Sequence, residues 1–318
     1  NTGKTDRFMV MINIYQKGNS GIVMLSRDNN QKRIVKEHSD FRPYMYVQDN
    51  NGQFESLFHQ KLKKIVYSNP GDVKRERDKY PKTWESDIIY TNRVLIDKVE
   101  KITKTPIRIM YFDIETAFVN GQDLTREISE VPITCISCLD SFSNKMVTFV
   151  WHKEIEKYQS SLVGLFGNYI YCFKNEKDII VKFLEFIIKL DFDLISGWNV
   201  CNFDLIYLKN RCEKLKLNFN KISMSGKVGL RFYHSYYGVE EAEIDISGRY
   251  AFDMLKAYRM LTFHELDSYS LNDIAKKELA EEKVEIEDNF EDLWNNNIMK
   301  LVEYNRKDVQ LLKMLNEK

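Results

Sequence analysis

The sequence predicts a mixed α/β (α+β) fold in two domains, and three observations lead to this class. At 318 residues the chain is long enough for two domains of ordinary size. Hydrophobic residues make up 43% and charged residues 30%, the profile of a folded rather than a disordered protein. Runs with strand periodicity alternate with runs that have helix periodicity. We place the domain boundary near Pro106, giving domains of residues 1–105 and 106–318.

The smaller N-terminal domain is predicted to be mixed α/β. Runs rich in β-branched and aromatic residues predict strands over 8-FMVMINIY-15, 21-GIVML-25 and 41-FRPYMYV-47. Apolar residues at helical spacing predict a helix over 55-ESLFHQKLKKIV-66. The segment 98-KVEKITKTP-106 is interpreted as a linker to the second domain.

The C-terminal domain is predicted to combine a mixed sheet with several helices. Strands are expected over 107-IRIMYF-112, 131-VPITCISCL-139, 146-MVTFVW-151 and 193-DLISGW-198. Helices are expected over 176-EKDIIVKFLEFIIKL-190, 204-DLIYLKNRCEKL-215, 266-LDSYSLNDIAKKEL-279 and 290-FEDLWNNNIMKLVEYNRKDVQLLKML-315. Glycines punctuate the aromatic-rich segment 226–250, which predicts one or two hairpins.

Composition narrows the classes of protein to consider. Basic and acidic residues both number 47, which argues against nonspecific nucleic-acid binding by the whole surface but leaves a local basic groove open. Five cysteines indicate free thiols in a reducing, intracellular setting, and we expect a cytoplasmic location. Cys135 and Cys138 form a CxxC on a predicted strand, where residues three apart face opposite sides, so a zinc knuckle is not expected. The sequence shows no membrane-spanning run and no signal-peptide pattern, and we expect no membrane partner.

Two carboxylates lie at the end of the first strand of the second domain, where their negative charges would repel each other. Asp113 and Glu115 are two residues apart, so their side chains share one face of the strand. Like charges so close raise each other's pKa unless a cation lies between them. A divalent metal would resolve the repulsion, and oxygen ligands favour Mg²⁺ or Mn²⁺. Taken alone, two solvated acids at a strand end would be the simpler interpretation.

Two further acids, Asp204 and Asp308, are candidate site residues because of their positions in predicted helices. Asp204 begins a predicted helix that follows a strand and Asn199. The helix dipole favours an acid at this position, so Asp204 could be a helix cap without any catalytic function. Tyr304 and Asp308 are four residues apart and therefore share one face of the last predicted helix. By itself, Asp308 would be interpreted as an exposed helix acid.

In combination, these residues resemble the 3′–5′ exonuclease domain of family B DNA polymerases. The three motifs are Asp113-Ile114-Glu115, Asn199 to Phe203-Asp204, and Tyr304 to Asp308. The segment 41-FRPYMY-46 is similar to a strand in the N-terminal domain of archaeal replicative polymerases. Similar phrases occur at 94-VLID-97, 248-GRYAFDML-255 and 269-YSLNDIA-275.

The resemblance implies a ribonuclease H-like fold, with a mixed sheet flanked by helices, and a two-metal mechanism. In that family four carboxylates hold two divalent metal ions, here Mg²⁺ or Mn²⁺. Asp113 would bridge both ions, and Glu115, Asp204 and Asp308 would complete the two coordination shells. Tyr304 would orient the attacking water, because a phenol with a pKa near 10 stays protonated at neutral pH.

The implied substrate is the 3′ end of a DNA strand frayed from a primer-template. Phe203 would pack beside the terminal nucleotide, and Asn199 would contact the substrate or a metal-bound water. Lys283 resembles a lysine that approaches the scissile phosphate in some relatives, although a plain surface lysine is the alternative.

A second implied site concerns the N-terminal domain. In archaeal relatives a pocket near the FRPY strand senses uracil in the template. Pro43 and Tyr44 match that strand, whereas 80-YPKTWESDI-88 does not align cleanly with the other wall. Core packing of the strand is therefore the default interpretation.

The polymerase motifs of the family would follow Asp308, and the chain ends ten residues later. We therefore expect no nucleotide addition by this chain. The absence of an initiator Met favours a piece of a longer polymerase over a split polymerase or a free-standing nuclease. Two other classes remain as alternatives: a non-catalytic DNA-binding module, and a free-standing DEDD-type nuclease that acts on RNA or DNA, for which recognition of the 2′-OH would discriminate.

Overall fold

The computed structural model divides into two compact units, Asn1–Ile107 and Arg108–Lys318. It describes residues 9–99, 102–117, 129–234, 238, 240–262, 264–281 and 290–318. Within these ranges, no helix is both long enough and apolar enough to cross a membrane.

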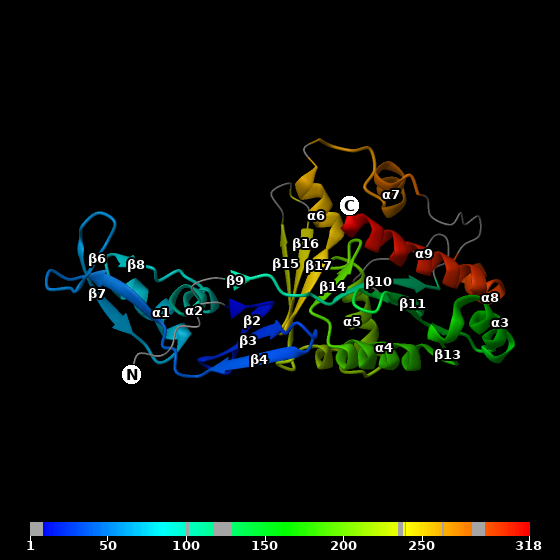
Figure 1. Ribbon diagram of the computed structural model, residues 1–318, viewed down its shortest axis with the longest axis horizontal. Helices are drawn as coiled ribbons and strands as arrows, with labels where there is room; N and C mark the ends of the chain where they lie inside the picture. The colour runs from blue at the N-terminus through cyan, green and yellow to red at the C-terminus, as the bar shows by residue number, and fades with distance from the viewer. Residues whose placement is uncertain are drawn as a thin grey trace. The chain divides into compact units, whose positions relative to one another are not determined.

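The first unit contains two small antiparallel sheets and two helices (Figure 1). One sheet has the order β2-β3-β4 and the other β6-β7-β5-β8, and a short parallel pair joins β1 to β9. The strands are β1 (Met9–Val10), β2 (Asn13–Lys17), β3 (Gly21–Arg27), β4 (Arg33–His38), β5 (Tyr44–Gln48), β6 (Phe54–Glu55), β7 (Lys61–Val66), β8 (Thr83–Trp84) and β9 (Ile102–Thr103). The helices are α1 (Pro70–Glu76), α2 (Tyr90–Lys98) and the 3-10 turn η1 (Arg77–Lys79).

The core of this unit forms where β3 meets the segment before β5 and helix α2. Ile22 and Val94 are fully buried there, together with Phe41 and Tyr90. The Tyr90 hydroxyl lies 2.8 Å from the carbonyl oxygen of Ser20 and 2.9 Å from that of Phe41. Helix α2 thus fixes the chain immediately before β5 by packing and by hydrogen bonding.

The helix predicted over 55–66 is wrong, because this segment forms the β6–β7 hairpin. Leu57 and Phe58, which supplied the helical spacing, lie at its tip with 95% and 82% of their surface exposed. His59 has a φ of 60°, a value suited to a turn and not to a helix. At the start of β7, Lys61 and Lys63 are exposed while Leu62 between them is buried, as in a strand covered on one side.

The second unit is built on one mixed sheet of eight strands, which confirms the predicted α/β class. Its order is β13-β12-β11-β10-β14-β17-β16-β15. The strands are β10 (Ile109–Thr116), β11 (Ile133–Asp140), β12 (Lys145–Trp151), β13 (Ile170–Phe173), β14 (Leu194–Gly197), β15 (Val228–His234), β16 (Glu240–Ile246) and β17 (Arg249–Asp253). At the centre, β10 pairs antiparallel to β11 but parallel to β14, which in turn runs parallel to β17.

Helices cover both faces of this sheet (Figure 1). They are α3 (Glu156–Phe166), α4 (Glu176–Leu190), α5 (Asp204–Lys214), α6 (Met254–Leu261), α7 (Leu271–Leu279), α8 (Phe290–Asn296) and α9 (Ile298–Glu317), with the 3-10 turns η2 (Gly167–Tyr169) and η3 (Phe219–Ile222). Helix α4 has the predicted bounds, whereas the helix predicted over 290–315 is divided at Asn297. The Asn297 side chain caps α9 by accepting a hydrogen bond from the Lys300 amide.

Strand β10 separates the two helical layers. On one face, Phe112 is fully buried and its ring lies 5.6 Å from that of Phe183 on α4. On the other face, Tyr111 packs with residues of α9, including Val309. Because strand residues alternate, Asp113 and Glu115 share the face of Tyr111 and project toward α9.

The last residue of β14 has to be a glycine. A Cβ atom at Gly197 would lie 2.8 Å from the carbonyl oxygen of Phe112 and 3.1 Å from Cβ of Val200. The close approach brings β14 against β10 and starts the loop toward α5.

Gly197→Ala should therefore lower the free energy of unfolding by ~1–3 kcal/mol, the range for an overpacked interior. Gly164→Ala is the matched control, because a Cβ on this helical residue meets no atom within 4 Å. That change should stabilise by ~0.5–1 kcal/mol. Urea denaturation of both variants measures the difference, and equal effects would contradict the close approach at Gly197.

Candidate active site

Three carboxylates meet on the α9 face of the sheet. Asp113 and Glu115 project from β10, and Asp308 projects from α9. One ligand oxygen from each lies within 4.8 Å of the other two. Glu115 is 8% exposed and Asp308 only 3%, so their charges stand in a largely dry environment. The predicted DxE and YxxxD motifs therefore converge in space.

An irregularity in the sheet accompanies this end of β10. Glu115 pairs with Cys135 but Thr116 pairs with Ile133, so Thr134 is an extra residue on β11. The Thr134 hydroxyl donates to the carbonyl oxygen of Glu115 at 3.1 Å. Such bulges bend a strand and redirect its side chains, and they are frequent next to active sites.

Asp204 lies beside this group without being part of the set of three. It is the first residue of α5 and is 4% exposed. Burial raises the pKa of its carboxyl well above the usual value, and the Asp113 charge raises it further. Hydrogen bonds from its own amide and from the Ile114 amide act in the opposite direction. Asp204 therefore faces β10 on the side of Asp113.

Asp253 helps to position the loop before Asp204, a role that the sequence interpretation missed. This residue ends β17 and is 7% exposed. Its carboxylate accepts hydrogen bonds from the amides of Cys201, at 3.0 Å, and Lys256, at 3.2 Å. It thereby caps α6 and fixes the loop that leads to Asp204. An acid between a strand and a helix is the ordinary signal of such a cap.

The other two residues of the second motif have visible structural roles. Asn199 has a φ of 62°, in the left-handed region that asparagine tolerates better than most residues. Its side-chain oxygen accepts a hydrogen bond from Asn202 at 3.1 Å. Phe203 is partly buried, with its ring 5.4 Å from that of Tyr207. Both residues shape the turn that delivers Asp204.

Tyr304 lies one helical turn before Asp308 and is half-buried. Its ring meets Phe290 of α8 edge to face, with the ring centres 5.4 Å apart. Lys283, the predicted phosphate contact, lies outside the described residues.

Asn305 is the second residue that the sequence interpretation missed. It is fully buried on α9, and its side-chain amide donates to Oδ2 of Asp113 at 2.8 Å. The signal was present: Leu301, Asn305 and Leu312 follow one core-facing stripe, in which an asparagine is out of place.

The donor set suits a hard divalent cation. Carboxylate oxygens are the ligands that Mg²⁺ and Mn²⁺ prefer, and three of them already lie close together. Without a cation, burial and mutual repulsion oppose the ionised state of these acids. The residues present therefore fit a metal centre.

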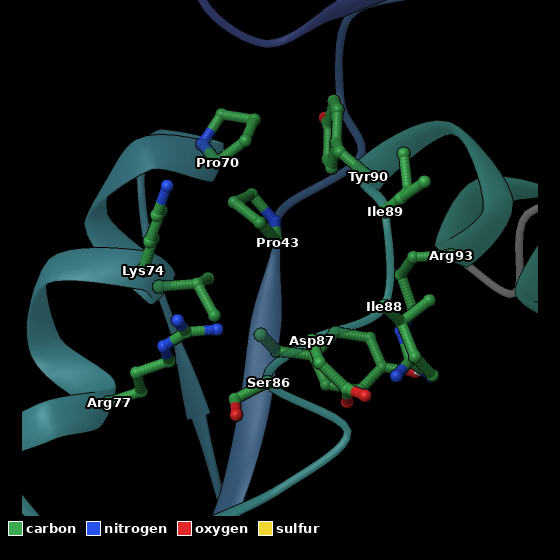
Figure 2. A pocket seen from close by; sticks show the side chains of 12 residues that line it. Pro43, Pro70, Lys74, Arg77, Ser86, Asp87, Ile88, Ile89, Tyr90 and Arg93 are labelled. Atoms are coloured by element: carbon green, nitrogen blue, oxygen red, sulfur yellow. Dashed lines mark hydrogen bonds between the residues drawn. The ribbon is translucent and has the colours of Figure 1, made fainter. Parts of the chain in front are cut away.

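A separate pocket of about 390 Å³ lies in the first unit (Figure 2). Pro43 stands between Pro70 on one side and Ile89 and Tyr90 on the other. The lining residues come from the start of β5, from α1 and η1, and from the segment that leads into α2: Pro43, Tyr44, Pro70, Val73, Lys74, Arg77, Ser86, Asp87, Ile88, Ile89, Tyr90 and Arg93. The walls combine apolar and polar side chains, with the basic side chains of Lys74 and Arg77 at one edge.

Tyr44 is held firmly within this pocket. Its hydroxyl donates to the Asp97 carboxylate, with a shortest distance of 2.7 Å, and accepts from Arg93 at 3.0 Å. Arg93 also lies over the Tyr44 ring, 4.5 Å from its centre. The pocket wall is therefore rigid at the position where the FRPY segment enters β5.

A mixed sheet flanked by helices and carrying a buried acidic cluster defines a domain suited to metal-assisted hydrolysis. Comparison with known proteins gives the family. Residues 71–274 match the exonuclease domain of DNA polymerase family B. The chain belongs to this family, and its second unit is consistent with the ribonuclease H-like type of fold.

Relatives with similar sequences are named as DNA polymerases. The chain is 32% identical to the DNA polymerase delta catalytic subunit of Oryza sativa over 246 residues, which are 74% of this chain and 22% of the relative. It is 30% identical to the delta catalytic subunit of Dictyostelium discoideum, over 64% of the chain and 22% of the relative. It is 28% identical to the DNA polymerase of Thermococcus kodakarensis, over 70% of the chain and 12% of the relative. The chain thus matches less than a quarter of each relative.

The raised pKa of Asp204 gives a pH-dependent prediction. Unfolded, this carboxyl titrates near 3.8, and the folded protein retains its proton to higher pH. Its contribution to stability is present below the unfolded pKa and is lost as pH rises through the folded pKa. In EDTA at pH 8, Asp204→Asn should therefore raise the Tm by at least about 2 °C, which corresponds to ~1 kcal/mol.

Thermal unfolding in EDTA at pH 4, 6 and 8 measures this effect, and the gain should grow with pH. Asp245→Asn on the exposed side of β16 is the control, and it should leave the Tm nearly unchanged. A pH-independent effect of Asp204→Asn would contradict the assignment.

Proposed function

We propose that this chain is the N-terminal and exonuclease portion of a family B DNA-directed DNA polymerase and removes nucleotides from the 3′ end of DNA. The reaction would be hydrolysis of the terminal phosphodiester at two divalent ions, Mg²⁺ or Mn²⁺, as in proofreading during replication. The observation that carries the proposal is the meeting of Asp113, Glu115 and Asp308 within 4.8 Å, with Asp204 facing Asp113.

Asp113 is the residue best placed to be shared between two ions. It belongs to the group with Glu115 and Asp308, and its charge also acts on Asp204. One ion would then lie among the three grouped acids and the other between Asp113 and Asp204. Bound divalent ions lower the pKa of water and neutralise charge that develops on a phosphate during in-line displacement.

The remaining motif residues would act on water and substrate. Tyr304, one turn from Asp308, would orient the attacking water as a hydrogen-bond donor or acceptor without losing its proton. Asn199 and Phe203 lie in the turn before Asp204, where an amide and an aromatic ring could contact a terminal nucleotide. Lys283 stays a proposed phosphate contact.

The polymerase domains of the same or a split chain are the proposed partners, and a primer-template is the proposed substrate. We assign residues 1–105 to the N-terminal domain and 106–318 to the exonuclease domain. The intracellular setting expected from the thiols suits this role.

Incubation with Mg²⁺ or Mn²⁺ should shorten single-stranded DNA from its 3′ end. Asp113→Ala and Asp308→Ala should each reduce the rate on the order of a hundredfold to a thousandfold, as when a principal electrostatic contact is removed. Asp245→Ala, an exposed acid on β16, is the matched control and should retain the wild-type rate. Gel analysis of oligonucleotides labelled at the 5′ end gives the rate and the direction.

Activity that persists in EDTA would refute the metal assignment. Shortening from the 5′ end would refute the direction. Equal rates on matched RNA and DNA would favour the free-standing DEDD-type nuclease, and binding without any cleavage in Mn²⁺ would favour the non-catalytic module.

The pocket in the first unit supports a second candidate function, recognition of a template nucleobase such as uracil. Pro43 and Tyr44 line an actual cavity, and the other wall comes from Pro70 and Val73 of α1 together with residues 86–90. Pro43 and Ile89 offer apolar surface to a flat base, Ser86 and Asp87 offer groups that could hydrogen-bond its edge, and Lys74 and Arg77 suit its phosphate. Tyr44 is only 7% exposed and belongs to the core of this unit, so base recognition is proposed in addition to the core packing of this strand and not in place of it.

Val73→Phe should fill this pocket. The protein should then bind a uracil-containing single strand and its thymine counterpart with about equal affinity. Val66→Phe is the control, because Val66 on β7 is 55% exposed and does not line the pocket. Fluorescence anisotropy with catalytically inactive Asp113→Ala protein measures both affinities. Equal binding of the two strands by the parent protein would reject uracil recognition.

A further inference from the structure

Asn305 joins the acidic site to the interior through both ends of its side-chain amide. The nitrogen donates to Oδ2 of Asp113 at 2.8 Å, and the oxygen accepts from Sγ of Cys135 at 3.4 Å. Asn305 and Cys135 are both fully buried. The contacts connect α9 with β10 and β11, across 192 and 170 positions of the sequence.

The polarity of the two contacts fixes the orientation of the amide. An ionised carboxylate only accepts hydrogen bonds, so it requires the NH₂ end of Asn305. A protonated thiol is a donor, so it requires the oxygen end. The observed contact runs from Sγ of Cys135 to the side-chain oxygen of Asn305, as this orientation requires. A flipped amide would lose both bonds.

The amide donates to Asp113, a carboxylate that interacts with each of the other three acids. Asp113 groups with Glu115 and Asp308, and its charge acts on Asp204. A neutral donor at Oδ2 holds this carboxylate in one orientation but, unlike a lysine, leaves its negative charge available to a cation. Residues that hydrogen-bond to metal ligands orient those ligands, and their loss typically lowers the affinity for the metal roughly ten- to a hundredfold.

We propose that Asn305 is a positioning residue that fixes the Asp113 carboxylate for metal binding, and that Cys135 fixes the Asn305 amide. This inference rests on the proposed metal-dependent function. It assigns a role to a thiol outside the three motifs and to an amide at a position that the third motif, Tyr304 to Asp308, leaves unspecified. A merely structural asparagine would affect the stability of the fold but not the affinity for metal.

The test is Mn²⁺ affinity of the full 318-residue chain, measured by titration with electron paramagnetic resonance of free Mn²⁺. Asn305→Leu keeps a similar volume but removes the donor, and it should weaken Mn²⁺ binding roughly ten- to a hundredfold. Leu301→Ala is the control: it lies on the same helix, is fully buried, and removes packing without a polar contact. It should lower the Tm and leave the Mn²⁺ affinity unchanged.

A pair of substitutions at Cys135 tests the orientation of the amide independently. Cys135→Ala removes the donor and should weaken Mn²⁺ binding several-fold, whereas Cys135→Ser retains a donor and should restore most of the affinity. Cys138→Ala is the matched control, since its thiol contacts the Val147 carbonyl at 3.6 Å instead. This pair carries the test if Asn305→Leu does not fold.

Each outcome has one meaning. Wild-type affinity in folded Asn305→Leu would overturn the positioning role, and so would an equal loss in Leu301→Ala. Equal affinities of Cys135→Ala and Cys135→Ser would overturn the role of the thiol. If the wild-type chain itself binds no Mn²⁺, the proposed metal-dependent function fails first, and the inference fails with it.

Discussion

Electrostatic repulsion between buried carboxylates is the constraint on which the second unit depends. Asp113, Glu115 and Asp308 share one small volume, and Asp204 adds a fourth charge next to Asp113. Burial alone disfavours each ionised side chain, and proximity disfavours them together. A fold that holds such a group must be stabilised elsewhere, and it places together the oxygen ligands that a divalent cation prefers.

The stabilising contacts come from the layers on either side of β10. Phe112 and Phe183 anchor the strand to α4, while Tyr111 packs with Val309 of α9. These apolar contacts lie one residue away from the acids, because alternation along the strand directs neighbours to opposite faces. Neutral groups then hold the carboxylates: the Asn305 amide binds Asp113, and backbone amides bind Asp204. Such contacts hold the acids in position without neutralising them.

Local rules predicted the parts of this arrangement that lie close together in sequence. The two-residue spacing of Asp113 and Glu115 and the four-residue spacing of Tyr304 and Asp308 correctly placed each pair on one face. Asn305 could not be assigned to Asp113 in this way, because their contact joins positions 192 apart. Periodicity also misled where its physical cause was absent: Leu57 and Phe58 have helical spacing but bury almost nothing at a hairpin tip.

Asp308 enters the acidic site through geometry and not through the family match. The match to the exonuclease domain of family B ends at residue 274, so it includes Asp113 and Asp204 but neither Tyr304 nor Asp308. Geometry supplies what the family match leaves out, because α9 brings the Asp308 carboxylate to the two acids of β10. An isolated helix acid would favour solvent, yet Asp308 is 3% exposed beside two like charges. Packing of α9 against β10 and β11 enforces this unfavourable position, and the proposed cation would offset the repulsion that results.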